Sequence, residues 1–256
     1  MASLLFAGGT IVRSTREERA DVLVEDGTIK KIGSRLPSGH CPLLEIKGQL
    51  LFPGLIDCHV HFREPGLTHK GNMRSESEAA QAGGVTTVCE MPNTIPPTVT
   101  VAAFADKVSR ARAIKACDIR FFMGATEGHH LLALRDIWRE SSAEFHKLKE
   151  RCCGLKLYFD HSTGSQGATR EVLEEAFHLC GALNIPVVCH CEDPEIDRNT
   201  RRPPESEITA IALALGLARR HEAHVHIAHL STRKGMDLVR QAKKEGVPVT
   251  CEAAPH

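Results

Sequence analysis

Two patterns of apolar and polar positions divide the chain near residue 50. Before that point, short apolar runs such as Leu4–Phe6 and Asp21–Val24 are separated by turn residues, among them Asp26-Gly27. An Asp-Gly step between two apolar runs is a strong signal for a β-hairpin. Residues 1–50 are therefore predicted to form a small antiparallel β-region, too short to make a good core alone.

Beyond residue 50, short apolar runs rich in β-branched residues alternate with longer stretches of helical spacing. The predicted strands are Leu50–Val60, Val85–Met91, Ile119–Gly124, Gly154–Phe159, Pro186–Cys191, Val225–Leu230 and Val247–Cys251. The clearest predicted helices are Thr98–Ala116, Leu131–Lys149, Thr169–Leu183, Glu205–Arg220 and Thr232–Glu245. Continuously apolar strands that alternate with helices are typical of a parallel sheet covered on both faces.

The predicted fold class is α/β, and seven strands favour a (β/α)8 barrel of the TIM type over a doubly wound sheet. A doubly wound sheet commonly carries Gly-x-Gly-x-x-Gly after a strand, and neither Gly83-Gly84 nor Gly164–Gly167 has that form. Pro255-His256 follows directly after the seventh predicted strand. We therefore expect an incomplete barrel that lacks its eighth strand.

Composition argues against several classes of protein. Apolar residues make up 42% of the chain and charged residues 25%, which is ordinary for a globular protein. Lys+Arg and Asp+Glu both number 32, so no positive surplus points to nucleic acid or to a membrane surface. The N-terminus has no signal-peptide pattern, and no run approaches the roughly 18 apolar residues of a membrane helix. The expected location is the cytoplasm.

The 10 cysteines are scattered and several lie inside apolar runs, which favours free buried thiols. The neighbours Cys152-Cys153 and the pair Cys189-x-Cys191 invite a metal or redox interpretation. Neither has a second cysteine pair at zinc-site spacing, so that interpretation is the weaker one.

Histidines gather at the carboxyl ends of the predicted strands. His59 and His61 share one face of the first strand because side chains alternate along a strand. His190 ends the fifth strand and His229 the sixth. The carboxyl ends of barrel strands surround one mouth, and imidazole-rich sites suit zinc and similar metals. A metal site is predicted there.

Two further predictions follow from the strand pattern. Lys156 lies inside the fourth strand, where a buried amine needs an ion partner, a lowered pKa or a chemical modification. His229 has the parity of Val225 and Ile227, so His224 and His226 are expected to face away from it.

Longer motifs carry a family resemblance. Residues 53–66 read PGLIDCHVHFREPG, and residues 82–88 read AGGVTTV with MPNT at positions 91–94. Gly154–Tyr158, Arg202–Glu205 and Cys251–His256 follow in matching order and rough spacing. Together these motifs resemble those of dihydroorotases, which are cyclic amidohydrolases of the amidohydrolase superfamily. The resemblance covers essentially the whole chain.

The resemblance implies a barrel with a binuclear zinc site. His59 and His61 would hold the first Zn²⁺, and His190 and His229 the second. Lys156, carbamylated by carbon dioxide, would bridge the two ions. It also implies a domain of residues 1–50 that forms part of a small β-sandwich, followed by the barrel in residues 51–256.

The same resemblance implies the substrate and the missing parts. Arg63 and Asn93 would bind the substrate carboxylate while N-carbamoyl-L-aspartate is reversibly cyclised to dihydroorotate in de novo pyrimidine biosynthesis. Dihydroorotases draw an Asp from strand eight, which would lie beyond His256, so no catalytic acid or base is expected within the chain. The chain alone is therefore expected to be poorly active.

Other functions stay open at this point. Allantoinases and dihydropyrimidinases share the barrel and the metals, although Arg63 argues against the neutral ring of a dihydropyrimidinase substrate. The sequence MPNT favours a dihydroorotase over an allantoinase, which carries an extra residue there. A non-catalytic dihydroorotase-like partner of aspartate transcarbamoylase is a further alternative. A homodimer and a small-molecule substrate are the expected partners, with no nucleic acid and no membrane.

Overall fold

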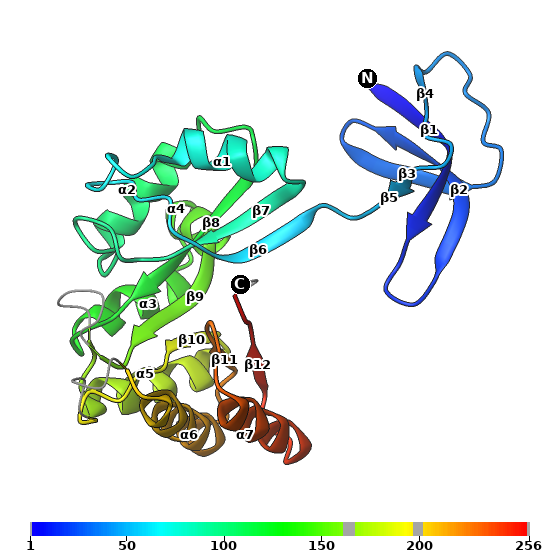
Figure 1. Ribbon diagram of the computed structural model, residues 1–256. Helices are drawn as coiled ribbons and strands as arrows, with labels where there is room; N and C mark the ends of the chain where they lie inside the picture. The colour runs from blue at the N-terminus through cyan, green and yellow to red at the C-terminus, as the bar shows by residue number, and fades with distance from the viewer. Residues whose placement is uncertain (1, 161–166, 197–201, 255–256) are drawn as a thin grey trace. The chain divides into compact units, whose positions relative to one another are not determined.

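The structure is a computed structural model that describes residues 2–160, 167–196 and 202–254 (Figure 1). The chain forms two compact units, Met1–Leu55 and Ile56–His256, and each is described by itself. Pro255 and His256, which end the last of the family motifs, lie outside the described residues. No helix in the described ranges combines the length and the apolar character that crossing a membrane would require.

The first unit is a single small sheet with the strand order β3-β2-β1-β4, and β5 also pairs with β1. Its strands are β1 (Ser3–Val12), β2 (Glu17–Glu25), β3 (Thr28–Gly33), β4 (Leu43–Glu45) and β5 (Leu50–Leu51). The predicted hairpin is confirmed, because β2 and β3 pair antiparallel around Asp26 and Gly27, which both have positive φ. β4 and β5, in contrast, run parallel to β1.

The second unit is built on a seven-stranded sheet in which the strands follow one another in chain order. The strands are β6 (Leu55–Val60), β7 (Val85–Glu90), β8 (Asp118–Gly124), β9 (Cys152–Tyr158), β10 (Val187–His190), β11 (Val225–Ile227) and β12 (Val249–Cys251). Pairing from β7 to β12 is parallel throughout. The sheet is curled, as the predicted barrel requires, and this prediction is confirmed for the described residues (Figure 1).

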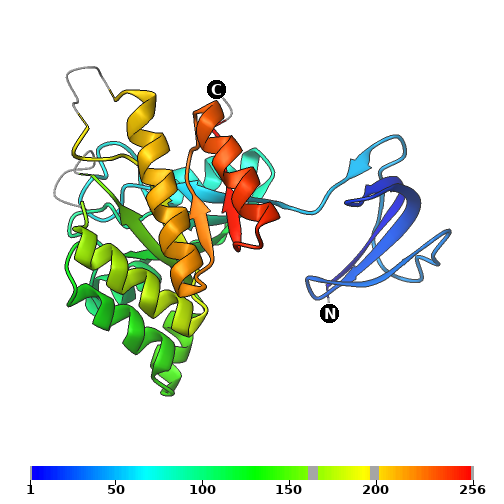
Figure 2. The ribbon, with the colours of Figure 1, turned by 90° about the horizontal axis from the view of Figure 1, so that it is seen from below.

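Helices connect the strands and cover one side of the sheet. They are α1 (Met73–Ala82), α2 (Val101–Ala111), α3 (His130–Arg139), α4 (Ala143–Lys149), α5 (Arg170–Leu183), α6 (Pro204–His221) and α7 (Arg233–Lys244). Figure 2 shows α5, α6 and α7 side by side, in agreement with their contacts. The large apolar core fills the space between these helices and the sheet.

Two predicted elements are wrong, and one helix of the structure has no counterpart among the clearest predicted helices. The predicted strand Leu50–Val60 is two strands, because Pro53-Gly54 separates β5 of the first unit from β6. The predicted helix Leu131–Lys149 is two helices, and Ser142 caps the second by accepting a hydrogen bond from the Phe145 backbone N–H. Helix α1 was not among the predicted helices, since only Met73 and Ser77 on it are buried.

A bulge in β9 sets which side chains face the inside of the curled sheet. Phe121 pairs with Cys152 and Phe122 with Gly154, so Cys153 has no opposite residue on β8. Gly154 has a φ of +143°, and a side chain there would collide with the carbonyl oxygen of Pro186. After the bulge, Leu155 joins the core under the helices, and Lys156 turns to the inner side.

A buried ion pair joins α2 to the end of β7. Lys107 and Glu90 are in direct contact and each side chain is only 1% exposed. The Lys107 ammonium also donates a hydrogen bond of 3.1 Å to the carbonyl oxygen of Met91. Burial raises the pKa of Glu90 to about 7, and the neighbouring Lys107 charge opposes that rise.

We predict that Lys107→Met lowers the free energy of unfolding by about 3–5 kcal/mol, because it leaves the Glu90 carboxylate buried without its cation. Without Lys107 the pKa of Glu90 rises further, so the deficit should be larger at pH 8 than at pH 5, where the carboxyl takes up a proton. Urea titrations of the unmodified protein and of Lys107→Met at pH 5 and pH 8 measure this loss in the free energy of unfolding. Glu90→Leu combined with Lys107→Met should recover much of the loss, and Lys244→Met on the exposed end of α7 is the control. An equal deficit at both pH values would contradict this account.

Candidate metal centre

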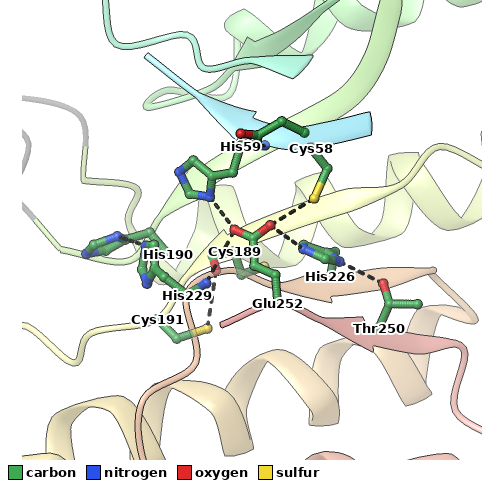
Figure 3. Close-up of polar contacts among 10 residues, drawn as sticks. Cys58, His59, Cys189, His190, Cys191, His226, His229, Thr250 and Glu252 are labelled. Carbon is green, nitrogen blue, oxygen red and sulfur yellow. Dashed lines mark hydrogen bonds and ion pairs between the residues drawn. The ribbon is translucent and has the colours of Figure 1, made fainter. Parts of the chain in front are cut away.

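The curl of the sheet brings the predicted histidines to one place, and Figure 3 shows three of them, His59, His190 and His229. The ring centroid of His59 lies 5.4 Å from the ring centroid of His61 and also 5.4 Å from that of His229. His190 and His229 are 4.6 Å apart by centroid, and His190 Nδ1 lies 2.8 Å from His229 Nε2. Side chains from β6, from β10 and from the segment after β11 therefore form one cluster of imidazoles.

The partly buried histidines His61, His190 and His229 are neutral at pH 7. Burial lowers the pKa of His61 and of His229 to about 4, and that of His190 to about 3. Neighbouring positive charges, including that of Lys156, act in the same direction on each pKa. A neutral imidazole is the form that binds a metal, so these residues need no proton loss before they coordinate one.

A partner outside the cluster orients His61. His61 Nδ1 lies 2.7 Å from Asn93 Oδ1, which has to be the acceptor because a carbonyl oxygen carries no hydrogen. His61 Nε2 is then unprotonated and available to a cation, an arrangement that is common around metal-binding histidines. The predicted role of Asn93 as a substrate ligand stays a prediction, and its amide NH₂ remains for such a contact.

Lys156 lies on the inner side of β9 and is 1% exposed. Its Nζ makes no hydrogen bond within the part of the chain that the structure describes. The centroid of the Tyr158 ring lies 5.1 Å from Nζ. Burial lowers the pKa of Lys156 to about 8. The structure therefore places an amine with a weakened hold on its proton next to neutral imidazoles.

Arg63 comes two residues after His61, in a left-handed backbone conformation with φ of 66°. Its carbonyl oxygen accepts a hydrogen bond of 3.0 Å from the Leu67 N–H, which closes the turn that follows β6. The Arg63 charge helps to lower the pKa of His61 and opposes the rise that burial causes in the pKa of Tyr158. Arg63 therefore lies at the border of the histidine cluster.

Glu252, directly after β12, is a member of the cluster that sequence reasoning missed. Its Oε1 contacts His59 Nδ1 and accepts a hydrogen bond of 3.4 Å from the His229 backbone N–H. Its Oε2 accepts a hydrogen bond of 2.9 Å from the Cys58 thiol and lies 3.4 Å from His226 Nε2. Glu252 thus connects the last strand of the sheet to the first (Figure 3).

Glu252 carries a negative charge at neutral pH. Burial alone would raise its pKa, but the contacts with His226, His59 and Cys58 outweigh burial and hold the pKa well below its usual range. Burial and the hydrogen bond to the Glu252 carboxylate raise the pKa of the Cys58 thiol to about 12, so Cys58 keeps its proton. One sign could have pointed to Glu252 in the sequence: it lies at the carboxyl end of a strand, as His190 does.

The expectation that His226 faces away from His229 is wrong. The His226 side chain contacts Glu252, which also contacts His59, and the His229 ring lies 5.4 Å from the His59 ring by centroid. Val225 and Ile227, in contrast, are buried in the core under the helices. The reason is that β11 ends at Ile227 and that His229 has a positive φ of 38°, so strand alternation does not continue to His229.

Comparison with known proteins places this geometry in a family. Residues 50–255 match the sequence pattern of the amidohydrolase family. The chain belongs to this family. Dihydroorotase from Aquifex aeolicus (strain VF5) is 31% identical over 271 residues, which cover 100% of this chain and 61% of that protein. The resemblance to dihydroorotases is thus confirmed over the whole chain.

Other amidohydrolases are similar as well. Allantoinase from Rubrobacter xylanophilus is 34% identical over 275 residues, which cover 99% of this chain and 58% of that protein. The structure of the L-hydantoinase (dihydropyrimidinase) from Arthrobacter aurescens matches with a TM-score of 0.89 and 27% identity, covering 100% of this chain and 59% of that one. The chain therefore spans about three fifths of the length of these relatives.

The lowered pKa values predict how the metal-free protein responds to pH. An imidazole whose pKa falls from 6.5 to about 4 on folding, as for His61, takes up a proton in the unfolded chain first. The free energy of unfolding should therefore fall as the pH is lowered from 7 to 5, by up to about 1.4 kcal/mol per pH unit for each such group.

Urea titrations of the chelator-treated protein at pH 7, 6 and 5 measure this slope. His61→Gln should make the slope shallower, whereas His129→Gln, at a side chain that is 64% exposed, should not change it. A slope that is the same in His61→Gln and in the unmodified protein would show that His61 is not held neutral by the fold.

Proposed function

We propose that this chain forms the metal-binding part of a dihydroorotase, which reversibly cyclises N-carbamoyl-L-aspartate to dihydroorotate in pyrimidine synthesis. One observation carries the proposal: the Lys156 amine is buried without a hydrogen bond in the described structure, beside imidazoles that burial keeps neutral. A structural lysine would be paired, as Lys107 is with Glu90. Lys156 is instead suited to become part of a metal site.

The residues present fit a pair of zinc ions. His59 and His61 would hold one ion, His190 and His229 the other, and Lys156 would contribute to both as a carbamate. A lysine with a pKa of about 8 is neutral in part of the population near pH 7. Its nitrogen can form a bond to the carbon of CO₂ and release a proton to solvent, which yields an anionic group with two oxygen ligands. When bound, the ions would polarise the cyclic amide and lower the pKa of water.

The chain's own side chains would select and orient the substrate. Arg63 can bind a carboxylate through two parallel hydrogen bonds, and it lies at the border of the histidine cluster. Asn93 Oδ1 is engaged by His61, so its NH₂ group is the part that would donate to the same carboxylate. This division of roles favours a substrate that carries a carboxylate beside its cyclic amide, as dihydroorotate does.

Allantoinase is the second candidate, because an allantoinase is 34% identical to this chain. Turnover of dihydroorotate, allantoin and dihydrouracil by the full-length protein, measured side by side, tests the choice. Hydrolysis of dihydroorotate well above that of the other two would support the proposal. Preferred turnover of allantoin or dihydrouracil would contradict it.

Arg63→Met should raise the KM for dihydroorotate and for N-carbamoyl-aspartate by roughly 10–100-fold, since a charged hydrogen bond to a carboxylate contributes about 1.5–3 kcal/mol. Any slow turnover of dihydrouracil, which has no carboxylate, should be unchanged. Steady-state kinetics on both substrates measure the two effects, with Arg240→Met on exposed α7 as the control. An equal loss on dihydrouracil would mean that Arg63 has another role.

Lys156→Ala should remove most of the bound zinc and reduce turnover at least 100-fold, because the bridging ligand is lost. Small carboxylic acids added to the assay should restore part of the activity by taking the place of the carbamate. Elemental analysis should give about two zinc ions per chain in the unmodified protein on these ligands, and in the exposed control Lys244→Ala. Retention of both ions in Lys156→Ala would rule out the bridging role.

A further inference from the structure

The hydroxyl of Tyr158 is a buried polar group without a partner. Tyr158 is the last residue of β9, and its side chain is only 3% exposed. The hydroxyl oxygen is closed to solvent and makes no hydrogen bond with any of the described residues. A buried tyrosine usually finds a partner for its hydroxyl, because a buried donor without one destabilises the fold. The packing of the protein alone therefore does not account for this hydroxyl.

The backbone and the ring of Tyr158 are held beside the histidine cluster. Its partner on β10 is His190, and its carbonyl oxygen accepts a hydrogen bond of 2.8 Å from the Ala168 N–H. The ring centroid lies 5.6 Å from that of His190 and 5.1 Å from Lys156 Nζ. Tyr158 thus packs against two of the residues that we assign to the zinc ions of the proposed function.

Two charged residues on neighbouring strands act on the hydroxyl. Burial and the charge of Glu90 raise the pKa of Tyr158, and the charge of Arg63 opposes that rise. Glu90 ends β7 and is already paired with Lys107, whereas Arg63 follows β6 at the border of the histidine cluster. The hydroxyl therefore lies within electrostatic reach of the residue that would bind the substrate carboxylate.

The surroundings of Tyr158 do not depend on the edges of the curled sheet. The ring packs between groups of β9 and β10, and the nearest acidic charge is at the end of β7. Each of these three strands pairs with a strand on both of its sides. The burial of the hydroxyl is therefore a property of the closed part of the sheet.

We propose that the Tyr158 hydroxyl donates a hydrogen bond to the carboxylate of the bound substrate, as a third donor beside Arg63 and Asn93. This inference rests on the proposed function and adds a specificity-determining residue to it. A phenol carries no charge of its own, so it adds a directed hydrogen bond without a further cation at the site. A substrate without a carboxylate leaves the hydroxyl unpaired and gains nothing from it.

Metal binding opens the region around Tyr158. His190 Nδ1 and His229 Nε2 lie 2.8 Å apart. Two nitrogen ligands of one tetrahedral zinc ion are about 3.3 Å apart, so these rings have to separate when they bind the same ion. Because the His190 ring packs against Tyr158, its movement changes the space beside the tyrosine. The test therefore uses the full-length, zinc-loaded protein.

A hydrogen bond to Glu90 is the structural alternative. Glu90 Oε1 is also buried without a hydrogen bond in the described structure, and the Tyr158 hydroxyl can donate to it after a small movement. In that case the hydroxyl stabilises the fold and has no role in binding. Its removal would then lower the melting temperature, whereas removal of a hydroxyl that serves only the substrate would not.

Tyr158→Phe keeps the ring and removes only the hydroxyl. We expect its KM for dihydroorotate to rise about 10-fold, equivalent to about 1.4 kcal/mol, with kcat little changed. The KM for dihydrouracil, or its inhibition constant where turnover is too slow, should not change. The melting temperature should be unchanged or higher, and the zinc content unchanged. Ser77→Ala removes a buried hydroxyl that donates to the Arg74 carbonyl oxygen on α1, and this control should lower the melting temperature and leave both constants unchanged.

The outcomes separate this inference from the proposed function. If dihydroorotate is turned over but its KM rises less than about 5-fold in Tyr158→Phe, or rises equally for dihydrouracil, only the inference is overturned. A lower melting temperature with an unchanged KM assigns the hydroxyl to Glu90 and also overturns it, as does a loss of zinc. If the unmodified protein does not turn over dihydroorotate, the proposed function fails and the role of Tyr158 fails with it.

Discussion

The constraint on which the rest depends is that strands β7 to β12 of the larger sheet run parallel, so that their carboxyl ends meet at one edge. Alternation then assigns each side chain to one of two environments. Leu155 and Leu157 pack under the helices, while Lys156 between them has to face inward. The same rule places His190 at the end of β10 beside it. The pairing of the strands therefore brings the polar side chains of the site together, and the apolar core stabilises the sheet that carries them.

Buried and partly buried charged groups of the larger unit differ in whether they keep their charge. Glu252 is partly buried but remains ionised, because an imidazole on either side and a thiol stabilise its charge. Lys156 has no such partners in the described structure, and its pKa falls. Lys107 shows the third solution, a buried cation that is paired with a carboxylate. Lys107 is thus a paired, structural cation, whereas Lys156 is left without a partner in the described structure, as the proposed metal site requires.

Much of the larger unit was predictable from the sequence because its strands are short, continuously apolar runs. The positions of β7 to β10 and the convergence of His59, His61, His190 and His229 follow from that pattern and from the common direction of the strands. These predictions needed no knowledge of individual contacts.

The remaining features depend on geometry that a one-dimensional pattern does not contain. The contact of Glu252 with Cys58 joins residues 194 positions apart, and it exists because the sheet curls. The inward direction of His226 depends on β11 ending after three residues, which puts His229 outside the alternation. Helix α1 begins with a capping box at Asn72 and carries a mostly polar sequence, so apolar periodicity could not reveal it.

The bulge in β9 has a consequence for the neighbouring cysteines of that strand. Because Cys153 is the extra residue, Cys152 packs with the core under the helices, and Cys153 packs with the small apolar cluster on the inner side. The adjacent thiols thus occupy two different environments on opposite faces of one sheet. Cys152-Cys153, which invited a redox interpretation, is the site of the β-bulge in this strand. Because of the bulge, Cys152 and Leu155 face the same side of the sheet although they are three positions apart. Deletion of one of these residues would reverse the alternation and point Lys156 into the apolar core.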